Sequence, residues 1–186
     1  MPKVHIEPTA TAQWHSLVQS ARHDCGADLD EGVEAYLVFM LMRFAERTLV
    51  GRHALALEFL QGLQAGGGRP ERLRDTGDEC LLVCGLFPQR VRRRPVPFRY
   101  YVDLGRGAYG TLAQAGAATD AEPFAELATE FITLMEILQT MRAHDPEQQL
   151  SALDAAELAC ETGSQQAWKR AAPGRGTPVS GGNRHH

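Results

Sequence analysis

The chain of 186 residues lacks long apolar stretches and has few cysteines. Its longest unbroken apolar run is the eight residues 35–42, whereas a helix needs about 20 apolar residues to cross a bilayer. Residues 1–7 lack the basic and apolar regions of a signal peptide, and four cysteines are too few for a disulfide framework. We therefore expect a soluble cytoplasmic protein with reduced thiols and no membrane contact.

Lysine and asparagine are also scarce. Only Lys3 and Lys169 are lysines among 19 basic residues, and Asn183 is the single asparagine. A GC-rich coding bias explains this preference for arginine, so the preference by itself indicates no function. The apolar share of 44% and the charged share of 23% are typical of globular chains. Disorder throughout, collagen and coiled-coil fibres are thereby excluded.

Apolar residues recur at helical spacing along most of the chain. We predict a single all-α domain, a bundle of six to eight helices at 9–162, between a lead-in at 1–8 and a disordered basic tail at 163–186. The predicted helices are 9–24, 30–49, 52–64, 70–75, 79–86, 123–142 and a last one from Asp145 to about 161.

Caps and helix-breaking residues place the predicted boundaries. Thr9, Asp28 and Asp120 are the expected N-caps, Asp28 as part of a capping box. Gly77 is expected to break a helix, and prolines make 87–97 a loop. Residues 98–117 fit either strand or helix at their start, and we favour helix because no second strand is evident to pair with them.

The string from Gly105 to Gly110 has the G-x-G-x-x-G pattern of nucleotide-binding loops. In a protein kinase a lysine on the next strand and two catalytic motifs follow this loop, but the next lysine here is Lys169. A dinucleotide fold needs a strand before the loop and a parallel strand after it, where we predict helices. We therefore expect these small residues to let helices pack closely.

No other residues form a recognisable catalytic or metal-binding motif. Cys80 and Cys84 share one helix face, but a structural zinc site needs four ligands, and their apolar neighbours favour core packing. Glu122, Glu126 and Glu130 are more typical of a solvated helix face than of a carboxylate site. We expect no cofactor and no bound metal, and we favour a protein that is not an enzyme.

Residues 89–109 form the candidate binding segment, in which arginines and aromatic residues alternate. The candidate site residues are Arg90, Arg92, Arg93, Arg94, Arg99, Tyr101, Arg106 and Tyr109. Guanidinium groups bind phosphate and carboxylate, and aromatic rings stack on bases. The pattern predicts a surface for an anionic ligand or a partner macromolecule.

An internal role for these arginines stays open. Residues 69–106 carry nine basic and five acidic groups, whereas residues 107–161 carry one basic and ten acidic groups. The arginines of 90–106 could therefore pair with the acidic helices at 122–161, and with the glutamates of 122–136 in particular. The net charge of −4 also differs from the basic charge of most nucleic-acid-binding domains.

Several short strings between residues 85 and 140 form a combined pattern. They are Gly85-Leu86-Phe87-Pro88 with the arginines that follow, then Tyr101, Gly105 and Ala108-Tyr109, and finally Phe124-Ala125-Glu126-Leu127-Ala128. Together they resemble an uncharacterised family of small helical proteobacterial proteins. The resemblance implies a helical bacterial protein and no known activity.

We expect a non-enzymatic adaptor or regulatory module that binds a protein partner through 89–109. Two alternatives stay open, a nucleic-acid binder that uses the same arginines and a small-ligand or enzyme pocket between helices, near Cys80, Cys84, Tyr101 and Tyr109. Nucleic-acid binding would weaken steeply as salt rises, and a ligand pocket needs a cavity of about 300 Å³ or more. Composition and spacing leave the partner and the oligomeric state open.

Overall fold

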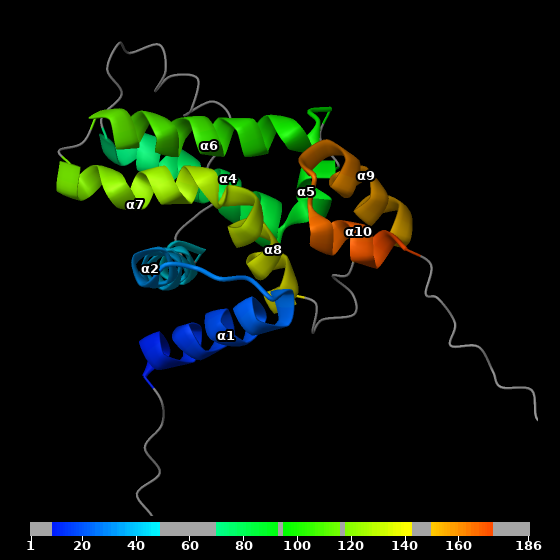
Figure 1. Ribbon diagram of the computed structural model, residues 1–186, viewed down its shortest axis with the longest axis horizontal. Coiled ribbons are helices and arrows are strands. Elements are labelled where there is room, and N and C mark those ends of the chain that lie inside the picture. Colours follow the sequence, from blue (N-terminus) through cyan, green and yellow to red (C-terminus); the bar gives the residue numbers. More distant parts are fainter. Residues whose placement is uncertain (1–8, 49–69, 93–94, 116–117, 143–149, 173–186) are drawn as a thin grey trace, which may run out of the picture.

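A computed structural model describes residues 9–48, 70–92, 95–115, 118–142 and 150–172 (Figure 1). Within these ranges every regular element is a helix, so the all-α prediction is confirmed. The nine helices are α1 (Ala10–Cys25), α2 (Glu31–Thr48), α4 (Pro70–Leu86), α5 (Pro88–Arg92), α6 (Phe98–Ala115), α7 (Ala118–Thr129), α8 (Phe131–Arg142), α9 (Ala152–Thr162) and α10 (Gln165–Ala171). The lead-in, the helix predicted at 52–64 and the tail beyond residue 172 lie outside the described residues.

The helices pack around α4, α6 and α8. Helix α4 contacts α6 and α8, α6 also contacts α7, and α1 contacts both α2 and α8. Helices α9 and α10 form a pair at the end of the bundle where α5 lies, and α9 contacts α6 (Figure 1). Among the described helices, none is long and apolar enough to cross a membrane.

The ends of α1 agree with the sequence, but the start of α2 does not. The Thr9 hydroxyl accepts a hydrogen bond of 3.3 Å from the Ala12 N–H, and Gly26 ends α1 in the left-handed conformation with φ of 64°. The predicted capping box at Asp28 is wrong, because α2 begins at residue 31. Asp30 is adjacent to that helix start, and its carboxylate accepts the Gly32 N–H at 2.7 Å.

The break predicted at Gly77 is also wrong, since α4 runs without interruption from residue 70 to residue 86. Gly77 is buried there, and a Cβ atom at this position would lie 2.5 Å from Cε1 of Tyr109. The glycine therefore serves helix packing: it lets the Tyr109 ring lie directly against the α4 backbone.

Prolines start helices in the segment predicted to be a loop. Pro88 is the first residue of α5. A backbone N–H at this position makes no hydrogen bond within the helix, so proline, which lacks the N–H, is favoured there. Pro97 directly precedes α6, whose 18 residues confirm the helical interpretation of 98–117 as far as the described residues extend. The strand-like residues Tyr101 and Val102 are buried on its core face.

The single helix predicted at 123–142 is two helices, α7 and α8, that meet at Glu130. The Thr129 hydroxyl donates a hydrogen bond of 3.0 Å to the Ala125 carbonyl, a bond that commonly bends helices. Since α7 begins at residue 118, Asp120 lies inside the helix and is not its N-cap, and Pro123 is internal.

The folded part of the chain continues past residue 162, where the domain was predicted to end. Ser164 is the N-cap of α10, and its hydroxyl accepts the Ala167 N–H at 3.1 Å. The same hydroxyl donates to a Glu136 carboxylate oxygen on α8 at 2.7 Å. These bonds attach α10 to the bundle, so at least residues 165–171 do not belong to a disordered tail.

The core lies where α2, α4, α6 and α8 meet. The largest fully buried side chains are those of Tyr109, Phe131, Leu37, Met40, Leu41, Leu81, Leu127, Leu134, Met135, Ile137, Leu138 and Val18. One face of α2, which carries Leu37 and Leu41, is fully buried in this core. Phe39 projects from another face and is 63% exposed in the described structure.

Candidate functional site

Two of the predicted arginines connect their segment to the acidic helix α9. The Arg92 guanidinium on α5 forms an ion pair with Asp154 and donates a hydrogen bond of 2.8 Å to Glu157. The backbone N–H of Arg99, in the first turn of α6, donates to Glu161 at 3.1 Å. Internal pairing with the acidic helices is thus confirmed for Arg92, whose partners lie on α9 and not among the glutamates of 122–136.

The other arginines have different surroundings. The Arg90 guanidinium lies over the Phe87 ring, 4.5 Å from its centroid. Arg106 donates to the Ala128 carbonyl at 3.1 Å, and the Arg99 side chain is exposed beside Asp103. Arg93 and Arg94 lie outside the described residues. In the described structure Arg90, Arg99 and Arg106 thus each have a neighbour other than α9 for their guanidinium group.

The two predicted tyrosines do not belong to that surface. Tyr101 is 8% exposed, and Tyr109 is completely buried. Both lie on the core face of α6, together with Val102, Gly105 and Leu112. Neither ring offers a face on which a base or a partner side chain could stack.

A surface pocket lies beside Arg92, between α5, the segment of residues 95–98 and α9. Its volume is about 400 Å³. The lining residues are Pro88, Val91, Arg92, Pro95, Val96, Pro97, Phe98, Leu150, Asp154, Glu157, Leu158 and Glu161. We call it the α5–α9 pocket. The sequence had placed a possible ligand cavity near Cys80, Cys84, Tyr101 and Tyr109, and none of these four residues lines the α5–α9 pocket.

One wall of the α5–α9 pocket is apolar and the opposite wall is acidic. The apolar wall comes from α5 and from residues 95–97, which we call the proline segment. Val91 on α5 is almost fully buried. The acidic wall comes from α9, where Asp154, Glu157 and Glu161 follow one another at intervals of three and four residues and so share one helix face. Arg92 spans the two walls through its contacts with the first two of these carboxylates.

The acidic wall was missed because the sequence analysis treated the acids of 107–161 as one block. The i, i+3, i+7 spacing of Asp154, Glu157 and Glu161 was the available signal, because it places these three acids on one helix face. Nothing local indicated that this face would meet α5, which lies about 60 residues earlier in the chain. That meeting is a property of the tertiary fold.

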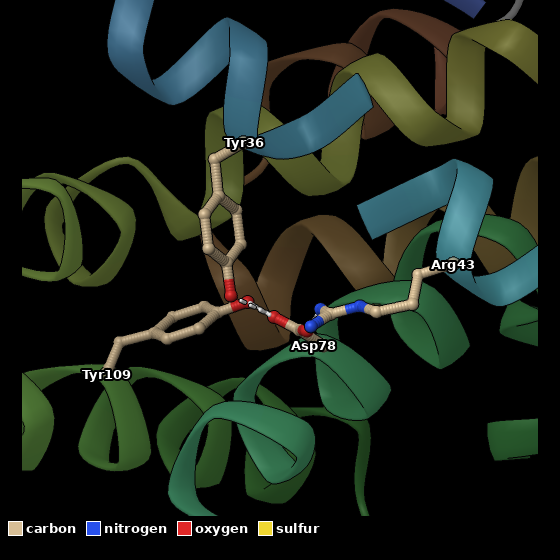
Figure 2. A network of polar contacts seen from close by, with 4 residues as sticks. All are labelled: Tyr36, Arg43, Asp78 and Tyr109. Carbon is tan, nitrogen blue, oxygen red and sulfur yellow. Dashed lines mark hydrogen bonds and ion pairs between the residues drawn. The ribbon is translucent and has the colours of Figure 1, made fainter. Parts of the chain in front are cut away.

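A second polar cluster lies in the core and joins α2, α4 and α6 (Figure 2). The Asp78 carboxylate accepts hydrogen bonds from the hydroxyls of Tyr36 at 2.6 Å and Tyr109 at 2.8 Å, and Arg43 forms an ion pair with it. Burial raises the pKa of Asp78, against the opposing effect of the tyrosine hydrogen bonds. Burial and the neighbouring carboxylate raise the pKa of both tyrosines.

This cluster connects α2, α4 and α6 through their side chains. Phe124 packs against both tyrosine rings, with centroids 5.9 Å from Tyr36 and 6.2 Å from Tyr109. None of the four polar residues lines the α5–α9 pocket. Because a buried carboxylate is stable only with partners, the cluster fixes the relative positions of the three helices.

The G-x-G-x-x-G string lies in the middle of α6, where its amides belong to a continuous helix. A Cβ atom at Gly105 would lie 2.4 Å from the Phe131 ring and 2.9 Å from Cβ of Cys80, whereas Gly107 and Gly110 have no side-chain neighbour within 4 Å. Of the three glycines, only Gly105 therefore confirms the expected close packing.

Cysteines and acids form no metal centre within the described ranges, where no group of three or more candidate ligands comes together. Cys80 and Cys84 are buried in the core, as their apolar neighbours predicted. Burial raises the pKa of the Cys80 thiol to about 12, which opposes formation of the thiolate that metals and electrophiles need.

Comparison with known proteins finds no family pattern, no curated relative and no solved structure that matches this chain. The resemblance of residues 85–140 to proteobacterial proteins stays a prediction. The function must therefore be argued from the geometry of the α5–α9 pocket.

Proposed function

We propose that the chain is a non-enzymatic binding module that holds a segment of a partner polypeptide in the α5–α9 pocket. The observation that carries this proposal is the pocket itself, about 400 Å³ in volume and lined largely by proline, valine, leucine and phenylalanine. Pockets that hold ligands commonly have volumes of about 300–1,000 Å³ and mostly apolar walls with a few polar groups.

The proline segment favours a binding role. Pro95, Val96 and Pro97 line the pocket immediately before α6 begins. Proline has a fixed φ, so such a wall loses little conformational entropy when a ligand binds. Arg92, Asp154 and Glu157 form ion pairs between α5 and α9, an arrangement suited to binding more than to proton transfer.

The charges of the pocket favour a polypeptide over a nucleic acid. Among the described residues that line it, three are carboxylates and one is an arginine, which already pairs with two of them. Phosphates would be repelled by such a wall. A nucleic-acid binder remains the alternative, and a gel-shift with DNA and RNA at low salt tests it, because counterion release makes such binding strongest there.

Site-specific photo-crosslinking tests the proposal. A benzophenone amino acid at position 96 should yield a discrete crosslinked polypeptide in the cells that make the protein. The same amino acid at position 13, which is exposed on α1 far along the chain from the pocket, should not yield that product. Equal products from both positions, or none from position 96, would count against the pocket as the contact surface.

A further inference from the structure

We infer that the α5–α9 pocket selects a polypeptide segment in which a large apolar side chain is followed closely by lysine or arginine. This inference rests on the proposed function and specifies the partner. The apolar side chain would enter between α5 and the proline segment. The cationic group would lie along the acidic face of α9.

The apolar requirement follows from the floor of the pocket. Val91 and Phe98 are almost fully buried, and Leu158 on α9 is 3% exposed. Their side chains therefore form a packed, fixed surface and not a mobile one. An apolar side chain that enters the pocket removes from water its own surface and that of the more exposed apolar lining residues Pro95, Val96, Pro97 and Leu150, which is the main favourable term in such contacts.

The cationic requirement follows from an excess of negative charge. The described lining residues include three carboxylates and one guanidinium, so among these residues negative charge exceeds positive charge by two. Arg92 neutralises part of the charge of Asp154 and Glu157. Glu161 forms no ion pair with any described residue, since its bond to Arg99 comes from a backbone N–H.

Glu161 is the residue best placed to recognise the cation. One of its carboxylate oxygens, Oε2, accepts the Arg99 N–H at 3.1 Å, which fixes the side chain at the pocket. The other oxygen, Oε1, accepts no hydrogen bond from the described residues. A lysine or arginine can donate to that oxygen without displacing the existing bond. Glu161 differs from Asp154 and Glu157 in that no described cation offsets its charge, whereas those two share the charge of Arg92.

The test uses the full chain and a random heptapeptide library displayed on phage. Selected peptides should share a large apolar residue with lysine or arginine within the next two positions. When such a peptide is synthesised with a fluorescent label, replacing its basic residue by glutamine should weaken binding about fivefold at low salt, as for a partly exposed ion pair. The difference should shrink in high salt.

Matched variants of the protein locate the effect. Glu161→Gln should remove the preference for the basic residue, while Glu126→Gln, the same change on α7 outside the pocket, should retain it. Val96→Trp and Leu150→Trp should each fill the pocket and abolish binding of every selected peptide. Circular dichroism and thermal melting of each variant verify that it folds.

The possible failures are distinguishable. Suppose that selected peptides bind the native chain and that both tryptophan variants abolish this binding. The proposed function then stands. This inference is nevertheless overturned if the peptides show no preference for a basic residue, or if that preference persists in Glu161→Gln. If no peptide is selected, or if the selected peptides bind both folded tryptophan variants as well as the native chain, the proposed function fails and this inference fails with it.

Discussion

Glu157 on α9 accepts a hydrogen bond of 2.8 Å from Arg92 on α5, and this pair spans the α5–α9 pocket. It joins the segment predicted to bind a partner with a helix about 60 residues later. The arginine-rich segment is therefore partly an internal connection. Beside this connection lies the α5–α9 pocket, to which α9 contributes Asp154, Glu157 and Glu161.

Replacing Arg92 by alanine should have a small effect on stability. Its side chain is 30% exposed and that of Glu157 is 56% exposed, and ion pairs in such positions contribute about 0.2–1 kcal/mol. Urea unfolding should show a decrease of at most about 1 kcal/mol in the free energy of unfolding, and less in 0.5 M salt. A decrease of several kcal/mol would mean that the pair is a main support of the fold.

Gly105 and Gly107 should respond in opposite directions to alanine. An added Cβ at Gly105 would overlap the Phe131 ring, and overpacking of a core commonly costs about 1–3 kcal/mol. Gly107 is exposed on the same helix with open space around it. Alanine there should stabilise the protein by about 0.5–1 kcal/mol, because glycine weakens a helix.

Thermal and urea unfolding of the two glycine variants provide the measurement. The two substitutions lie two positions apart in the same helix, so each variant is the control for the other. If both alanines were tolerated equally, α6 would not pack against α8 as closely as the structure has it.

Removing the Tyr109 hydroxyl should destabilise the fold. Tyr109→Phe leaves the buried Asp78 carboxylate with one hydrogen-bond donor fewer, and bonds to charged groups contribute about 1.5–3 kcal/mol. Tyr100→Phe is the matched control, because Tyr100 is 42% exposed on the same helix. Urea unfolding should show a clear loss for the first variant and less than about 0.5 kcal/mol for the second.

Alkaline pH should destabilise the protein because buried groups hold their protons. Burial raises the pKa of the Tyr109 hydroxyl well above 10 and the pKa of the Cys80 thiol from 9.0 to about 12. Below about pH 9 both the folded and the unfolded chain hold these protons, so stability does not change on their account. At higher pH the unfolded chain releases the protons while the folded chain keeps them, so folding is disfavoured.

Urea unfolding between pH 8 and pH 11 measures this effect. The free energy of unfolding should fall by up to about 1.4 kcal/mol per pH unit for each group that ionises only in the unfolded chain. The decline should begin near pH 9 with the thiols and steepen near pH 10 with the tyrosines. Stability that stays constant to pH 11 would show that these groups are accessible to water.

The fold could be predicted from the sequence where local rules decide it. Thr9 and Gly26 delimit α1 because a capping hydroxyl and a left-handed glycine act within one turn of the helix. The same rules failed at Gly77, since its role depends on a ring from another helix. A glycine that ends a helix and a glycine that admits a neighbouring side chain are identical in the sequence.

The candidate site was predicted less well than the fold. The helical spacing of Tyr101 and Tyr109 with Val102 and Leu112 already placed both tyrosines on the apolar face of α6, although the alternation with arginines suggested a surface. For Arg92 the alternative of pairing with the acidic helices at 122–161 is confirmed, but its particular partners on α9 were not predicted. The acidic wall depends on where α9 docks, and no local pattern specifies that contact.

The most direct test of the account is an NMR titration of the isotope-labelled full chain with the tightest selected peptide. We predict that the backbone amides whose signals shift belong mainly to residues 88–98 and 150–161, with Val96 and Glu161 among them. Shifts confined to α1 and α2, or spread evenly over the bundle, would contradict the claim that the α5–α9 pocket is the contact surface.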